Sequence, residues 1–231
     1  WGAAGVPNAA GTQEFAIDVS GVDAQAAPGG VRVNFIPRDG GNQFSGTIFG
    51  SYSRGRFAAD NYTGSDVHQR GLTAPSTTKE NGDFNPGVGG PIVRDKFWFF
   101  VSGRLLKADN YVAGQFMNAN ANDLTQIRYV RTDEQAILHQ DQSIFQVHLT
   151  YQLNDKNKLG FTYDQESYCG CPFGVTAGVT PDAASDRRFP LQRFVSADWT
   201  SPVTNRLLLE ASGIHRVERW GNMHLQTGKG D

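Results

Sequence analysis

The sequence has few charged residues for its length, and their signs nearly cancel. Asp, Glu, Lys and Arg make up 19% of the 231 residues, and the formal net charge is -2. Soluble domains usually carry about 25%. The basic residues are scattered along the chain and do not form the cluster or stripe that binds nucleic acid. We therefore expect no nucleic-acid partner.

Cysteine is almost missing as well. The two cysteines form the sequence Cys169-Gly170-Cys171. A structural zinc site needs about four ligands, and no second pair exists to complete one. We favour a disulfide in an exposed loop, or two unpaired thiols, over a metal site. We expect no metal and no other cofactor.

Long apolar runs and catalytic motifs are also missing. No segment approaches the roughly 18 apolar residues of a membrane helix, which excludes helical spans but leaves barrel strands open, because their signal is much weaker. The sequence contains no G-x-S-x-G, P-loop or HExxH motif. We expect no catalytic residues and no enzymatic activity.

Glycine and aromatic residues are abundant, with 27 glycines and 11% aromatics. Several segments alternate apolar and polar residues, the period of a half-buried strand, and SIFQVHLTYQL at 143–153 does so most clearly. We predict an all-β antiparallel fold with seven main strands. They are expected at 44–53, 82–92, 97–106, 143–153, 158–165, 191–200 and 206–217.

The connections between these strands alternate in length. Long polar loops are predicted near 54–81, 107–142 and 166–190, with short turns between them. An outer-membrane barrel has short periplasmic turns and long extracellular loops, so the alternation favours a transmembrane barrel fragment. An interfacial aromatic girdle is expected from Tyr52, Phe97, Tyr151 and Trp199. A soluble antiparallel sandwich or barrel is the alternative, since its strands also alternate.

A break in the pattern divides the chain. The sequence from Pro37 to Asn42 has turn chemistry, with proline and two glycines. Before it, 12–22 and 31–36 have strand character; after it the long alternating segments begin. We predict the C-terminal part of a plug domain at 1–41 and the N-terminal portion of a barrel at 42–231, and we expect the chain to be a piece of a longer protein.

Two motifs carry a family resemblance. The first runs from Thr12 to Tyr52 and includes Gln13-Glu14-Phe15, Gly29-Gly30, Asn34 and Gly40-Gly41-Asn42 followed by Phe44 and Gly46. The second is Gly89-Gly90-Pro91-Ile92, then Arg94-Asp95-Lys96 and an aromatic strand. In this order they resemble the TonB-dependent outer-membrane receptors, in particular the Oar-like branch with a carboxypeptidase-regulatory-like N-terminal domain.

The resemblance implies a location and partners. It implies a barrel of about twenty-two strands filled by a plug, located in the cell outer membrane, in contact with outer-membrane lipid and energised by a TonB-type protein. The function expected is uptake of a scarce solute, which could be a siderophore, oligosaccharide, peptide or cobalamin. The alternative is a non-transporting surface protein that serves adhesion or binds glycans.

Individual side chains give weaker signals. His148 is expected to line the polar face as part of a hydrogen-bond network. His139 and Asp141 suggest an acid–base pair, but without a nucleophile a solvated loop is the simpler interpretation. No ligand-binding residue is assigned. Other residues considered are His68, His215 and His224, the mixed-charge loop Asp182, Asp186, Arg187 and Arg188, and the loop tyrosines Tyr62, Tyr111 and Tyr168.

Overall fold

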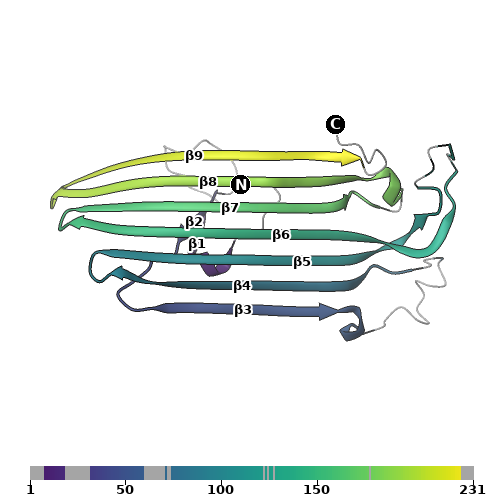
Figure 1. The fold of residues 1–231 in the computed structure, drawn as a ribbon, viewed down its shortest axis with the longest axis horizontal. Helices are drawn as coiled ribbons and strands as arrows, with labels where there is room; N and C mark the ends of the chain where they lie inside the picture. Colours follow the sequence, from purple (N-terminus) through teal and green to yellow (C-terminus); the bar gives the residue numbers. More distant parts are fainter. Residues whose placement is uncertain are drawn as a thin grey trace.

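The structure, a computed structural model, describes residues 8–18, 32–59, 71, 74–121, 123, 125–126, 128–176 and 178–224. Seven long strands form one sheet in chain order, each antiparallel to its neighbours (Figure 1). The all-β antiparallel prediction is confirmed. The sheet is open, with β3 and β9 at its edges, as expected for part of a larger barrel. The strands are β3 (Ser45–Arg54), β4 (Thr77–Val93), β5 (Phe97–Asn118), β6 (Arg131–Asn154), β7 (Asn157–Phe173), β8 (Ser185–Thr204) and β9 (Leu207–His224).

The short and the long connections between the strands lie at opposite ends of the sheet. Short hairpins join β4 to β5, β6 to β7 and β8 to β9 at one end, on the left of Figure 1. Longer connections join the other pairs at the opposite end, which we call the far end. The predicted alternation is therefore confirmed.

The predicted extent of the long loops is wrong. Most of 107–142 is strand, because β5 continues to Asn118 and β6 begins at Arg131. In the same way β4 includes 77–81, β7 includes 166–173 and β8 includes 185–190. Toward the far end both faces of the strands carry polar side chains, so the alternation that identifies a strand disappears while backbone pairing continues.

The sheet has one apolar and one polar face. The apolar face carries exposed side chains such as Ile48, Val88 and Leu105, which are 80%, 48% and 62% exposed. The polar face carries buried polar residues, including Ser102 and Thr150. The strand period places successive residues on opposite faces, and the register keeps each row of side chains on one face across the sheet.

The apolar face has a defined height. At the short-hairpin end one cross-strand row contains Phe97, Tyr151, Leu159 and Trp199. Along β5 the apolar positions of this face end at Leu105, and Lys107 and Asp109 follow at the next two positions. We call the stretch of this face between Phe97 and Leu105 the apolar band. Three of the four predicted girdle aromatics lie in its first row, whereas Tyr52 lies toward the far end.

A second, two-stranded sheet precedes the large one. It contains β1 (Thr12–Asp18) and β2 (Arg32–Pro37), which are antiparallel and follow the short turn η1 (Ala9–Gly11). The rings of Phe15 and Phe35 meet edge to face at 5.3 Å. The turn predicted at Pro37 to Asn42 separates β2 from β3, which begins at Ser45, while the division into plug and barrel at this point stays a prediction. No helix among the described residues is long and apolar enough to cross a membrane.

Candidate functional site

The polar face binds the N-terminal segment through a buried amide network. Asn8 Nδ2 donates to Ser102 Oγ at 3.0 Å, and Asn85 Nδ2 donates to Asn8 Oδ1 at 2.6 Å. The backbone N–H of Ala10 donates to Asn85 Oδ1 at 3.1 Å. Because buried amides are costly to leave unpaired, this network fixes where the segment lies on β4 and β5.

Asp39 makes the second attachment. Its Oδ1 lies 2.7 Å from His148 Nε2 and accepts a hydrogen bond from Thr150 Oγ1 at 3.2 Å, while Lys158 Nζ is 3.5 Å from Oδ2. The hydrogen bond with His148 lowers the pKa of Asp39 to about 2; partial burial opposes this, and the charges of His148 and Lys158 support it. His148 also bonds Thr162 Oγ1 at 2.8 Å, so its predicted place in a hydrogen-bond network is confirmed.

The residues after Asp39 fit closely against the short-hairpin end. A Cβ on Gly40 would lie 2.2 Å from the carbonyl oxygen of Phe99, which only glycine avoids, whereas a Cβ on Gly41 would meet nothing within 4 Å. Asn42 Oδ1 accepts hydrogen bonds from the backbone N–H of Asp95 at 2.8 Å and from Trp98 Nε1 at 2.7 Å. We call residues 8–18 and 32–42, with these contacts, the docked segment.

A cavity of about 380 Å³ lies between the docked segment and the polar face. It can hold a small polar solute or ordered water. Its lining includes Asn8, Gly11, Phe100, Gln146, His148, Asp164, Phe194 and Asp198.

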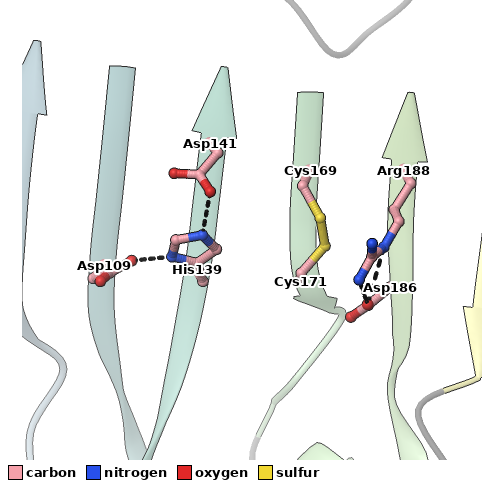
Figure 2. The surroundings of a disulfide bond; sticks show 7 residues. All are labelled: Asp109, His139, Asp141, Cys169, Cys171, Asp186 and Arg188. Carbon is pink, nitrogen blue, oxygen red and sulfur yellow. Dashed lines mark hydrogen bonds and ion pairs between the residues drawn. A yellow bond between two sulfur atoms is a disulfide. The ribbon is translucent and has the colours of Figure 1, made fainter. Parts of the chain in front are cut away.

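The far end carries a second group of charged residues, drawn in Figure 2. His139 lies between two carboxylates, with Nδ1 bonded to Asp109 and Nε2 at 2.5 Å from Asp141 Oδ2. The expectation of a solvated loop is wrong, because His139 belongs to β6 and pairs across to β5. Burial lowers the pKa of His139, but the bonds and charges of the two carboxylates outweigh it and raise that pKa above its ordinary value.

The cysteines form a disulfide within β7. Of the two alternatives favoured by the sequence, the disulfide is present, but it lies in a strand and not in a loop. Asp186 and Arg188 lie beside it in β8 (Figure 2), joined at 2.6 Å between Asp186 Oδ2 and Arg188 Nη2. They too were predicted to be loop residues. Within the described ranges, no three His, Cys, Asp or Glu side chains are arranged to bind a metal ion.

The other candidates are spread over the far end or lie outside the described part. Tyr168 packs against Phe189, whose ring stacks on Trp220 with a centroid distance of 6.2 Å. Arg187 lies over Phe189. Of the rest, Asp182 bonds Asn118, Tyr111 belongs to β5, His215 is exposed on β9, and Tyr62, His68 and the side chain of His224 lie outside the described residues.

Sequence reasoning missed Asn8, Asp39, Asn85 and Asp109. Their partners are distant in sequence, with 75 residues separating Ala10 from Asn85 and 111 separating Asp39 from Thr150. The Gly40-Gly41-Asn42 turn was the only local signal near them, and it indicated a turn without its contacts.

Comparison with known proteins gives one distant relationship. The chain is 32% identical over 96 residues to the TonB-dependent transporter Oar of Myxococcus xanthus; the match covers 38% of this chain and 9% of that protein. No protein-family model matches the chain. No solved structure matches it. The chain is thus similar, over part of its length, to a small part of a transporter.

Proposed function

We propose that the chain is part of an outer-membrane receptor that takes up a scarce solute with energy from a TonB-type partner. The observation that carries the proposal is the two-faced sheet. Its apolar face is exposed, and its polar face binds the docked segment as a barrel wall binds a plug. The distant similarity to a TonB-dependent transporter supports the same reading.

The dimensions of the apolar band fit a bilayer. A membrane-spanning strand needs about 9–11 tilted residues, and the band from Phe97 to Leu105 matches this length before Lys107 and Asp109 follow. The row of Phe97, Tyr151 and Trp199 then lies at one membrane interface, where aromatic side chains are favoured. The short hairpins face the periplasm, and the far end faces the outside.

The polar face supplies the path for the solute. The docked segment is attached by hydrogen bonds and by Asp39 with its basic partners, and polar contacts of this kind can exchange for water when the plug is pulled. The aromatic row of Tyr168, Phe189 and Trp220, with Arg187 beside it, offers a contact surface for the solute at the outer opening.

The test uses the complete protein that carries this chain, expressed with its signal sequence. We expect it in the outer-membrane fraction, migrating differently on a denaturing gel before and after heating, and we expect it to bind the periplasmic domain of a TonB-type protein. A complete protein that stays soluble without a heat shift would refute the membrane assignment. A heat-modifiable protein that does not bind the TonB-type domain would refute transport and leave a non-transporting surface role.

A further inference from the structure

A groove of about 840 Å³ crosses the apolar face where the apolar band meets the charged far end. Two adjacent rows of paired residues form it, and we call it the border groove. The row nearer the short hairpins contains Gly50, Phe84, Leu105, Ser143 and Ser167, and the row nearer the far end contains Tyr52, Gly82, Lys107, Asp141, Cys169 and Arg188.

Small residues make the groove hollow. Gly50, Gly82, Ser143 and Ser167 line it between the larger side chains of both rows. Packing does not require these small residues: a Cβ on Gly82 would first meet Tyr52 Cδ2 at 3.9 Å, an ordinary contact. The hollow is therefore open space on the surface, and a larger residue could fill it.

The exposed charges of the groove are mainly positive. The side chains of Lys107 and Arg188 are 46% and 49% exposed, whereas their carboxylate partners Asp109 and Asp186 are only 8% and 7% exposed. The buried carboxylates hold the cations in place, and an incoming ligand meets the cations. Glu80, 3.9 Å from Lys107, is 29% exposed.

One exposed carboxylate lies between the two cations. Asp141 is 52% exposed and is bonded to His139. Although burial opposes it, the neighbouring carboxylates raise the pKa of His139, so the imidazolium that offsets the charge of Asp141 is favoured. Lys107 and Arg188 remain the groups best placed to bind an anion.

We propose that the border groove binds a lipid of the surrounding membrane whose headgroup carries two separated phosphates. The acyl chains lie along the apolar band, and the phosphates contact Lys107 and Arg188. Three strand spacings separate β5 from β8, or roughly 14 Å at about 4.8 Å each, so one headgroup can reach both cations. The occupant is a lipid because the groove is continuous with the apolar band; the inference rests on the proposed function, which places that band in a bilayer.

The test compares two lipids with the same acyl chains. The complete protein is purified in detergent, freed of lipid and titrated with diphosphoryl or monophosphoryl lipid A, and bound lipid is counted by native mass spectrometry. We expect the diphosphoryl form to bind about 10-fold more tightly, since one further charge-assisted contact is worth about 1.4 kcal/mol or more. Lys107→Gln and Arg188→Gln should each remove the preference, and Arg94→Gln, an exposed change at the opposite end, should keep it.

A second variant separates shape from charge. Gly82→Leu fills the hollow without altering charge and should weaken both lipids equally. Equal binding of the two lipids by the unchanged protein, an unaltered preference in Lys107→Gln, or full displacement by inorganic phosphate would each overturn the inference. The heat-shift assay on the same sample distinguishes a wrong lipid site from a wrong membrane assignment. A protein that is not a membrane barrel shows no heat shift, whereas a barrel without the lipid site keeps it.

Discussion

Gly40 provides the sharpest test of how the docked segment is attached. In Gly40→Ala the new methyl would lie 2.2 Å from the carbonyl oxygen of Phe99 and 2.9 Å from its backbone carbon and nitrogen. Backbone atoms of a paired strand cannot move aside, so residues 39–42 must lift from β5. Overpacking of this kind costs about 1–3 kcal/mol, which would raise the population of the undocked state about 5- to 150-fold.

Gly41→Ala is the matched control, because a Cβ there meets nothing within 4 Å. The assay places a reporter cysteine at Ala10 in the complete protein, because Ala10 belongs to the docked segment and is only 8% exposed against the polar face. The two cysteines of this chain are joined in a disulfide, so within this chain a maleimide labels only the reporter. We expect Gly40→Ala to raise the labelling rate by the stated factor and Gly41→Ala to leave it unchanged. Equal rates in the two variants would refute the contact between Gly40 and β5.

Three further predictions follow from the two faces and their charges. Val88→Arg, in the middle of the apolar band, should lower the free energy of unfolding in membranes by about 2–4 kcal/mol. Ile214→Arg on the polar face, where Ile214 is 69% exposed, should lower it by less than about 0.5 kcal/mol. Similar losses for the two variants in urea unfolding would argue against a lipid-facing band. Because the pKa of Asp39 falls to about 2 from its ordinary 3.8, docking should be fully stabilised above pH 4 and weaken as pH falls toward 2. The full pKa shift corresponds to about 2.5 kcal/mol of docking free energy, which solvent screening of this half-exposed group reduces to about 1 kcal/mol. Asp39→Asn should remove the pH dependence of reporter labelling. Because the pKa of His139 is raised, the stability that it gives to the far end should be complete below pH 6.5 and lost as pH rises through the higher pKa of the folded state. Amide exchange in β5 and β6 should therefore become faster over that pH range, and this pH dependence should be missing in His139→Gln.

The sequence by itself determined the strand order and the two faces of the sheet. Alternation in segments such as 143–153 located the strands, because apolar side chains repeat every second residue wherever one face is apolar and the other polar. Turn residues such as Asp155 and Lys156 marked the short hairpins. The proline and glycines after β2 marked the break before the large sheet.

Only the tertiary structure decided how far the strands extend and which polar groups meet. Beyond Leu105 polar and apolar side chains are mixed without a period of two, so the pairing of these strands leaves no alternating pattern in the sequence. The partners of Asp39, and the pairing of His139 with Asp109, are set by register between strands, and these hydrogen bonds join residues that local sequence cannot relate. The border groove arises for the same reason, since Gly82, Lys107 and Arg188 become neighbours only when five strands align in one register.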